Sequence, residues 1–576
     1  MPDVDLVLLH APSVYDFRRR PSMHGPISDV IPSTPIFEMY PIGFVSMVGY
    51  LEQHGYSARI INLAVKMLKN PGLDVEKLLS SLNTQAFGLD LHWLAHAAGS
   101  LDVAALIKKL HPDKPIILGG LSASYFHEEI IQRYPQVDYI LRGDTTEKPL
   151  LRLMECIENG KEPEDVENLT WRTRQGGKKV NPLSFVPQNL DDLWIDYGAV
   201  VKMVVRHLDL ESTLPYENFM DYPFTALLTC KGCAYNCITC GGSCYAFKTT
   251  YGRDSPVFKS PEKLVEEIRI VSEYFKAPLF LIGDLRQGGM RWAEEVLDGI
   301  RKEDLDNTVT YELFDAVPEN YMKRLKESAD SWTIEISPES HDDRLRGVMG
   351  KPYTAQQMEE TIEKALAYGC RKVAVYFMVG LSGQTTDSVM ESVDYCRRLY
   401  DMYRDDSRLL TFITPMAPFM DPGSIIYDAP EEYGYTRLYG TLTEHKNALY
   451  QPSWKMYLSY YTKWMSRDQI ADATYDAMIS MNRLKAERRI TDPAKAEQIS
   501  LGLEMARDIM RRIDGIVATA KSEAEREERY QQLRHEIEEA KKSTFLSKRE
   551  LRMPGGAGIR FKGALVFLSR MLMGKT

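Results

Sequence analysis

The feature that most constrains the fold is a repeated alternation of short apolar runs with helical patterns. Between residues 5 and 144 the apolar runs are DLVLLH, ARIINL, AFGLDLHW, PIILGG and DYILRGD. Segments such as GFVSMVGYLEQHG lie between them and carry apolar residues at helical spacing. Strands joined by crossover helices predict an α/β domain with a flavodoxin-like (Rossmann-type) parallel sheet. Its ligands are expected at the carboxyl ends of the strands.

A second alternation of apolar runs and helical patterns starts near residue 223 and predicts a different fold. Its apolar runs are FTALLT, PLFLIGD, TVTYELF, SWTIEIS, KVAVYFMVG and LLTFITPM, again separated by helical segments. Six such units predict a partial (β/α)6 TIM-like barrel with its chemistry at the carboxyl ends of the strands. Long helical patterns then follow. We therefore expect a flavodoxin-like domain over 1–190, a linker over 191–222, the barrel over 223–430 and a helical C-terminal domain over 431–576.

Charge and hydropathy bear on the partners. The net charge of −10 argues against nucleic-acid binding, which usually needs a basic face. The N-terminus has no basic n-region and no apolar run reaches the roughly 18 residues of a membrane span, so we expect a cytoplasmic protein. The tail over 556–576 alternates apolar residues with basic ones, namely Arg560, Lys562, Arg570 and Lys575. This pattern fits either peripheral membrane contact or a helix packed on the barrel.

Five of the eight cysteines lie in one stretch, CKGCAYNCITCGGSC, over residues 230–244. Reduced, clustered cysteines in the cytosol are more often metal ligands than disulfides. The spacing fits neither a zinc ribbon nor a ferredoxin run, although spacing alone does not select a trio. What remains is Cys233, Cys237 and Cys240 as three ligands of a 4Fe–4S cluster, with one iron open to a ligand. Cys230 and Cys244 are then either structural or part of the reaction.

The segment CAYNCITC, directly after the first predicted barrel strand, resembles the CxxxCxxC signature of radical S-adenosylmethionine (SAM) enzymes. The resemblance implies that SAM binds the open iron. An electron supplied by a donor such as flavodoxin or ferredoxin then cleaves it to methionine and a 5′-deoxyadenosyl radical. Thr239 departs from the aromatic residue usual before the third cysteine. By the same resemblance, SAM contacts are expected at the strand ends, from Asp284, Ser337, Glu339 and Gly380.

The pairing of a flavodoxin-like domain with such a barrel resembles the cobalamin-dependent, class B methylase-like radical SAM enzymes. In that class, small residues at the ends of the fourth and fifth strands line the groove for the nucleotide tail of cobalamin. The matching positions here are Gly119, Gly120, Gly143 and Asp144. A bulky tail passing against strand ends requires such small residues.

One near-match concerns the cobalt ligand. Asp90-Leu91-His92 begins like the DxHxxG motif that supplies a histidine to cobalt, but position 95 is alanine. The motif also belongs after the first strand, where this chain has HAPSVYDFRR. We therefore predict that His92 is not a cobalt ligand. The loop with His92 and Trp93 is expected nearest the lower face of the cobalt.

The resemblance implies methyl transfer from methylcobalamin to an unactivated carbon, with the cofactors supplying the difficult chemistry. The class also contains non-methylating reactions such as cyclisation, rearrangement and carbon–carbon bond formation. For this chain, the alternative is such a reaction, with a lipid or isoprenoid as one candidate substrate. Two further alternatives are a radical SAM enzyme that has lost cobalamin and a non-catalytic iron–sulfur protein. The substrate, a small molecule or a lipid, is not readable from the sequence.

Overall fold

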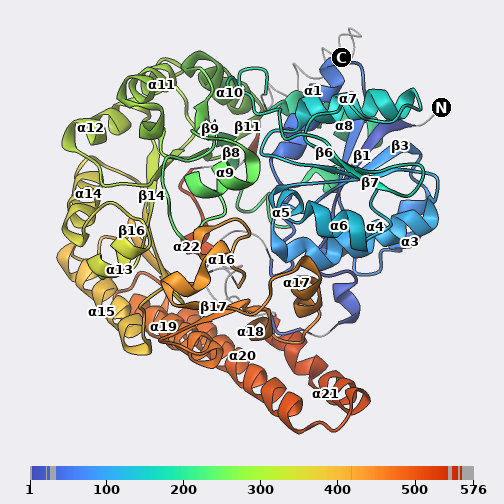
Figure 1. Cartoon of the computed structure of the whole chain (residues 1–576). Helices are drawn as coiled ribbons and strands as arrows, with labels where there is room; N and C mark the ends of the chain where they lie inside the picture. Colours follow the sequence, from blue (N-terminus) through green and yellow to red (C-terminus); the bar gives the residue numbers. More distant parts are fainter. Residues whose placement is uncertain are drawn as a thin grey trace.

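The computed structural model is a two-domain α/β structure with a helical C-terminal region (Figure 1). It describes residues 3–20, 22–25, 34–193, 195–416, 418–541, 548–555 and 558–560. The flavodoxin-like domain and the barrel lie side by side, and the C-terminal helices run beneath both of them in this view. Residues of both domains therefore line the interface between them.

The flavodoxin-like sheet has five parallel strands in the order β2-β1-β3-β4-β5. They are β1 (Val4–His10), β2 (Ala58–Asn62), β3 (Thr84–Asp90), β4 (Ile116–Gly119) and β5 (Tyr139–Leu141). In this order the connections change direction between β1 and β3, where such sheets bind their ligands. An antiparallel hairpin, β6 (Leu169–Arg172) and β7 (Lys178–Val180), extends the sheet beyond β5.

Side chains of β1 alternate between two buried layers, as the period of a strand requires. Leu6 and Leu8 pack with α1 (Gly43–Gln53) and α7 (Glu147–Glu158). Val7 and Leu9 belong to the core on the other face, which includes α4 (Ala97–Leu110). Burial on both faces explains why the strands read as continuous apolar runs.

The segment predicted as a linker, 191–222, contains a packed helix. Helix α8 (Tyr197–His207) lies against α1, and Ala199 and Met203 join the core on that face of the sheet. This segment therefore extends the core of the flavodoxin-like domain.

The second domain has six parallel strands in the order β8-β12-β13-β14-β15-β16. These are β8 (Thr225–Leu228), β12 (Leu279–Ile282), β13 (Val309–Leu313), β14 (Trp332–Glu339), β15 (Val373–Val379) and β16 (Leu409–Pro415). Helices α10 (Pro261–Tyr274), α11 (Met290–Lys302), α12 (Glu319–Ser328), α14 (Ala355–Ala367) and α15 (Thr386–Met402) surround them (Figure 1). Among the described strands, β8 and β16 do not pair, so the barrel is open there. The predicted partial barrel is confirmed.

The lumen of the barrel is only partly filled. Alternate residues of β8, β12, β14 and β15 are partly exposed, as is Glu312 on β13, while their immediate neighbours are buried. The partly exposed set is Ala226, Leu228, Phe280, Ile282, Glu312, Glu335, Ser337, Tyr376 and Met378. One wall of the lumen, on β8 and β12, is thus apolar. The wall on β13 and β14 carries carboxyl groups.

The C-terminal region stacks α19 (Arg467–Glu487), α20 (Pro493–Thr519) and α21 (Glu523–Lys541), with α19 packed against α15 and β16. Residues 548–555 and 558–560 return to the barrel. There the buried Glu550 pairs with Lys485, and Lys372 Nζ donates to the Glu550 carbonyl at 2.8 Å. A short strand, β19 (Gly558–Ile559), adds to β11 (Phe275–Lys276).

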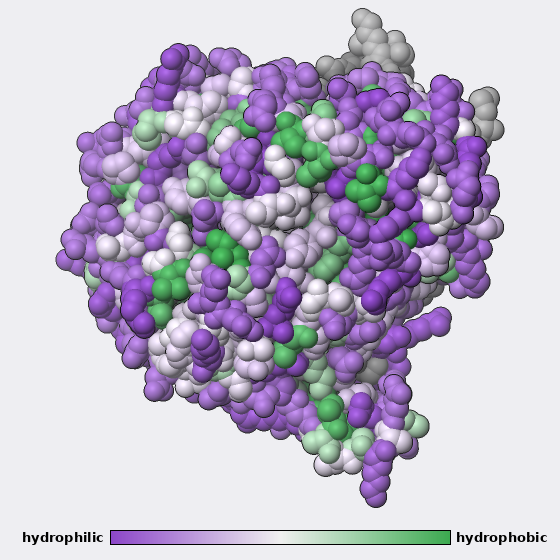
Figure 2. All heavy atoms as spheres, in the orientation of Figure 1, coloured by the Kyte–Doolittle hydropathy of each residue, from purple (hydrophilic) through white to green (hydrophobic). Residues whose placement is uncertain are grey.

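The tail for which we considered membrane contact lies mostly outside the described residues. Of its basic side chains only Arg560 is described, and it pairs with Asp306 of the barrel. Lys562, Arg570 and Lys575 fall outside the described ranges. Within those ranges, no helix has both the length and the apolar character needed to cross a membrane. The face of the molecule in Figure 2 is mainly hydrophilic, with small separate hydrophobic groups.

Candidate active site between the two domains

A cavity of about 640 Å³ lies between the carboxyl edge of the flavodoxin-like sheet and the mouth of the barrel. We call it the interdomain cavity. From the first domain it is lined by every residue predicted for cobalamin, namely His92, Trp93, Gly119, Gly120, Gly143 and Asp144. From the second domain it is lined by Cys230, Cys233, Cys240, Gly283, Gln287 and Phe314, among others. The fold thus brings the predicted cobalamin edge and two of the three predicted cluster ligands to one space.

The loop that follows β8 presents the three predicted cluster cysteines. Gln287 tethers this loop, because its Oε1 accepts from the Ala234 N–H at 2.8 Å and lies 3.3 Å from Cys233 Sγ. Backbone N–H groups point at the sulfurs: Tyr235 donates to Cys233 Sγ at 3.4 Å, and Gly242 donates to Cys240 Sγ at 3.2 Å. Such donors stabilise thiolate ligands and tune a bound cluster.

Within the described ranges, no three His, Cys, Asp or Glu side chains are close enough to hold a single metal ion. A four-iron cluster makes a different demand, because each thiolate bonds a different iron and the sulfurs stand farther apart. Three cysteines on one loop, two of them with N–H donors to their sulfurs, therefore fit a 4Fe–4S cluster and do not fit a zinc site.

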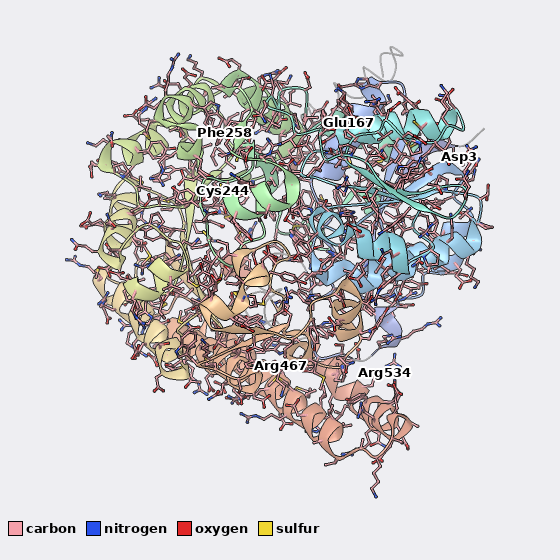
Figure 3. All side chains as sticks on the ribbon, viewed as in Figure 1. Asp3, Glu167, Cys244, Phe258, Arg467 and Arg534 are labelled. Atoms are coloured by element: carbon pink, nitrogen blue, oxygen red, sulfur yellow. The ribbon has the colours of Figure 1, made fainter. Side chains whose placement is uncertain are left out.

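The two remaining cysteines of the stretch have different surroundings. Cys230 lines the interdomain cavity, and burial raises the pKa of its thiol to about 11. Cys244, labelled in Figure 3, begins α9 (Cys244–Tyr251). Its N–H donates to the Tyr235 carbonyl at 2.8 Å, which closes the cysteine loop. These surroundings favour a structural role for Cys244. Cys230, at the cavity wall, is positioned to contact a ligand.

Lys351 links the predicted SAM side of the site to the cluster loop. Its Nζ lies 3.1 Å from Glu339 Oε1, and the other carboxylate oxygen of Glu339 is buried without a partner. Burial alone would lower the pKa of Lys351, but the charges of Glu339 and Cys237 outweigh it and raise the pKa. Glu339 also has a φ of +66°, a backbone conformation unusual for this residue type. A positive charge is thereby held beside Cys237.

Asp284 and Gly380 both contact neighbouring residues of the barrel and the C-terminal region. The Asp284 carboxylate accepts from the Arg286 backbone N–H at 3.0 Å and from the Phe314 N–H at 2.9 Å, and it pairs with the Arg286 guanidinium. Gly380 has a φ of +98°, and a Cβ there would lie 2.8 Å from the Tyr460 hydroxyl. These two residues shape the loops that follow β12 and β15. SAM contacts from them, from Ser337 and from Glu339 stay predictions.

Glu312 on β13 is a functional candidate that sequence reasoning missed. Its Oε2 accepts from the Gly283 N–H at 2.7 Å, and burial raises its pKa to about 7. Glu335 is its register neighbour on β14 and is hydrogen-bonded by Tyr376. No ion pair to either carboxylate occurs in the described part of the chain. The available signal was a glutamate inside each of two otherwise buried strand patterns, TVTYELF and SWTIEIS.

At the cobalamin edge, the backbone conformation at position 120 requires a glycine. Its φ is +113°, and a Cβ there would lie 2.7 Å from the backbone N and Cα of His92. Burial lowers the pKa of His92 to about 4, so its imidazole is neutral near pH 7. Trp93 beside it is 43% exposed. His92 and Trp93 therefore lie together at this edge of the cavity, next to the glycine turn.

Asp144 has a role that the sequence did not reveal. Its carboxylate pairs with Arg253 of the second domain, whose side chain is fully buried, and Lys231 Nζ donates to its carbonyl at 2.8 Å. Arg253 also donates to the Pro187 carbonyl at 3.0 Å. Asp144 lines the cavity, but its charge ties the flavodoxin-like domain to the segment that follows the cluster loop.

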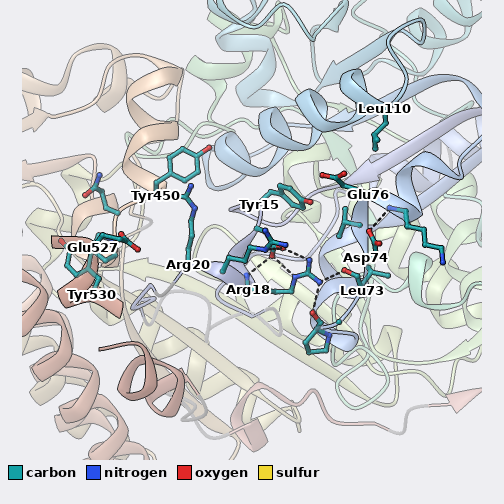
Figure 4. A pocket seen from close by; sticks show the side chains of 18 of the residues that line it. Tyr15, Arg18, Arg20, Leu73, Asp74, Glu76, Leu110, Tyr450, Glu527 and Tyr530 are labelled. Atoms are coloured by element: carbon teal, nitrogen blue, oxygen red, sulfur yellow. Dashed lines mark hydrogen bonds and ion pairs between the residues drawn. The ribbon is translucent and has the colours of Figure 1, made fainter. Parts of the chain in front are cut away.

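A second hollow of about 1340 Å³ opens on the surface between the loop after β1, α3 (Val75–Ser80) and α21 (Figure 4). Arg18 is paired there with Asp16, and Arg20 lies over the Tyr450 ring. Basic and acidic side chains are mixed along its walls, and it is lined by none of the predicted site residues. The interdomain cavity is therefore the candidate active site.

These features define the class: a flavodoxin-like domain and an open barrel that share one cavity, with three cysteines at its barrel side. Residues 227–396 match the family model of the Radical SAM superfamily, and residues 30–150 match that of the B12 binding domain. The chain thus combines a B12 binding domain with a radical SAM domain. The predicted resemblance is confirmed, as are the cofactors it implies, a 4Fe–4S cluster, SAM and cobalamin.

Two curated relatives are distant. The uncharacterized methyltransferase PH0819 of Pyrococcus horikoshii is 22% identical over 329 residues, which cover 57% of this chain and 67% of that protein. The anaerobic magnesium-protoporphyrin IX monomethyl ester cyclase of Rubrivivax gelatinosus is 21% identical over 345 residues, covering 58% of this chain and 57% of that protein. The alignments thus span about two thirds or less of these relatives' own lengths.

Solved structures share the fold. The radical SAM methyltransferase TsrM from Kitasatospora setae superposes with a TM-score of 0.52 at 14% identity, covering 75% of this chain and 78% of that one. The cobalamin-dependent SAM radical enzyme OxsB superposes with a TM-score of 0.52 at 15% identity, covering 99% of this chain and 80% of that one. The predicted fold class, a flavodoxin-like domain, a partial barrel and a helical C-terminal region, is confirmed.

Proposed function

We propose that this chain is a radical SAM enzyme that methylates an unactivated carbon of its substrate with the help of cobalamin. The single observation that carries the proposal is the interdomain cavity, which joins the cobalamin edge of the first domain to the cysteine loop of the second. Two cofactors that share one space can act on one substrate without releasing an intermediate to water.

When bound, the cluster and SAM supply the radical that abstracts hydrogen, and cobalamin supplies the methyl group. The residues of the chain position these groups. Cys233, Cys237 and Cys240 would hold the cluster, with Gln287 fixing their loop. Lys351 keeps a positive charge beside Cys237, which offsets the negative charge that three thiolates bring. Gly120 allows the loop with His92 to pack directly against the turn that follows β4.

The lumen bears on the substrate. Its walls combine apolar residues on β8 and β12 with the carboxyl groups of Glu312 and Glu335. The two carboxyl groups are register neighbours, and burial raises the pKa of each. Such a lumen favours a small-molecule or lipid substrate with an apolar body and a hydrogen-bond donor or cationic group. An electron donor such as flavodoxin or ferredoxin is part of the same proposal.

The test starts from protein purified anaerobically from cells supplied with cobalamin. We expect near-stoichiometric cobalt, a 4Fe–4S cluster by iron and sulfide analysis, and 5′-deoxyadenosine from SAM under reducing conditions. Cys237→Ala is expected to lose both the cluster and 5′-deoxyadenosine, whereas the matched variant Cys244→Ala is expected to keep them. Cluster-loaded protein that forms no 5′-deoxyadenosine would make the chain a non-catalytic iron–sulfur protein.

A second candidate function is a non-methylating radical reaction. It is favoured by the similarity to a protein named as a cyclase. SAM labelled with deuterium in its methyl group separates the two candidates when the enzyme is incubated with a lipid and small-molecule extract. A product that carries the labelled methyl group supports methylation. Consumption of SAM with an unlabelled product supports cyclisation or rearrangement.

A further inference from the structure

A buried ion pair lies where the flavodoxin-like sheet changes direction. His10 ends β1 and Asp90 ends the neighbouring strand β3, and His10 Nδ1 lies 2.9 Å from Asp90 Oδ1. The two side chains are 0% and 3% exposed. In sheets of this order, the ligand binds outside the carboxyl ends of these two strands. The pair is therefore placed directly below the position expected for the cofactor.

The hydrogen bonds and the pKa shifts together favour a charged pair. The Phe37 carbonyl lies 3.1 Å from His10 Nε2 and 2.7 Å from His96 Nε2, and because a carbonyl only accepts, both nitrogens carry a proton. The other ring nitrogen of His10, Nδ1, lies 2.9 Å from the Asp90 carboxyl group, a contact that fits an imidazolium beside a carboxylate. Burial alone would lower the pKa of His10, but Asp90 outweighs it and raises the pKa; His10 in turn lowers the pKa of Asp90 against burial.

The second oxygen of Asp90 has no partner within the described residues. Oδ2 is buried and accepts no hydrogen bond, although Asp90 lines the interdomain cavity together with His92. A buried carboxylate oxygen without a donor is costly, by about 1–3 kcal/mol or more for a charged group. An oxygen of this kind at the wall of a cavity is suited to a donor that arrives with a ligand.

We propose that Asp90 is a positioning residue for cobalamin, with its free Oδ2 accepting a hydrogen bond from the lower side of the bound cofactor. His10 keeps the carboxylate ionised and fixes its direction through the other oxygen. The donor is either an O–H of water at the lower face of the corrin ring or an N–H of a corrin side-chain amide. The inference rests on cobalamin as the cofactor and is independent of which reaction the enzyme performs.

The experiment compares wild-type protein with Asp90→Asn, which keeps the shape of the side chain and removes its charge. Hydroxocobalamin is titrated into cobalamin-free protein and followed by visible absorbance. Loss of a hydrogen bond to a charged acceptor is expected to raise the Kd roughly 10- to 100-fold. The bound cofactor is then reduced by one electron with a chemical reductant, and a change in the visible and EPR spectra of the resulting cob(II)alamin in addition identifies water as the donor. A weaker affinity with unchanged spectra identifies a corrin amide.

A control variant and a fallback double variant complete the experiment. Asp102→Asn removes a carboxylate of the same domain that pairs with Lys446 and does not line the cavity, and we expect it to leave cobalamin affinity unchanged. If Asp90→Asn does not fold, the double variant His10→Gln/Asp90→Asn removes both charges together and avoids a lone buried charge. Folded variant protein, judged by iron content and circular dichroism, that binds hydroxocobalamin with wild-type affinity and spectra would overturn the proposal. Such a result would leave cobalamin binding and radical chemistry intact.

Discussion

The ion pair between Arg253 and Asp144 gives the most demanding prediction, because it joins the two domains and both of its side chains are buried. The side chains are 0% and 4% exposed, and two guanidinium nitrogens of Arg253 face the two carboxylate oxygens of Asp144. We consider Arg253→Met, which keeps a long apolar side chain and removes the charge. Asp144 then stays buried with its carboxylate uncompensated, since Lys231 reaches only its backbone carbonyl.

The expected cost follows from this burial. Breaking a buried pair from one side typically costs about 3–5 kcal/mol, because the remaining charge cannot be hydrated. Replacing both partners removes that penalty. The double variant Arg253→Met/Asp144→Asn should therefore be less destabilised than the sum of the single variants, by about 1–3 kcal/mol.

Equilibrium urea unfolding of the four proteins, at equal cofactor content, measures this cycle. The single variant Asp144→Asn supplies the fourth corner and tests the arginine left alone. If Arg253→Met costs less than about 1 kcal/mol, or the two substitutions add within about 0.5 kcal/mol, the pair is hydrated and the reasoning fails.

Three further predictions concern the cavity and the lumen. Gly120→Ala should destabilise the protein by about 1–3 kcal/mol and abolish cobalamin retention, because the added Cβ would clash with the His92 backbone. The control Gly119→Ala should fold normally, because the atom nearest to its Cβ is 3.8 Å away. Cobalt content and melting curves compare the two variants. Burial raises the pKa of Glu312 from 4.5 to about 7, so the protonated group stabilises the fold below about pH 4.5 and this stability is lost as the pH rises through about 7. Urea midpoints at about pH 5 and about pH 8 should differ less in Glu312→Gln than in wild type, and an equal difference would contradict the buried, protonated state. Lys351→Met should reduce iron incorporation and cost about 3 kcal/mol, since it leaves the Glu339 carboxylate buried without a cation; full iron content would show that the charge is dispensable.

Much of the fold was predictable because its signals are local. Each parallel strand of both sheets lies within an apolar run of the sequence, since crossover helices bury at least one face of every such strand. The cysteine loop was also predictable, because its three ligands are neighbours in the chain. The segment 191–222 was less readable. Its helix α8 is stabilised by packing on α1, and that contact has no local signature.

The site residues divide in the same way. By itself, the sequence determined which elements form, where the cluster cysteines stand and which glycines follow the strands, because propensity, periodicity and ligand spacing act over a few residues. Only the tertiary structure decided how charges are used. It placed Asp144 against Arg253, left one oxygen of Asp90 free above His10, and aligned Glu312 with Glu335. The physical reason is that burial and charge pairing depend on residues from distant segments, and their energies are set only when those segments meet in a low-dielectric interior.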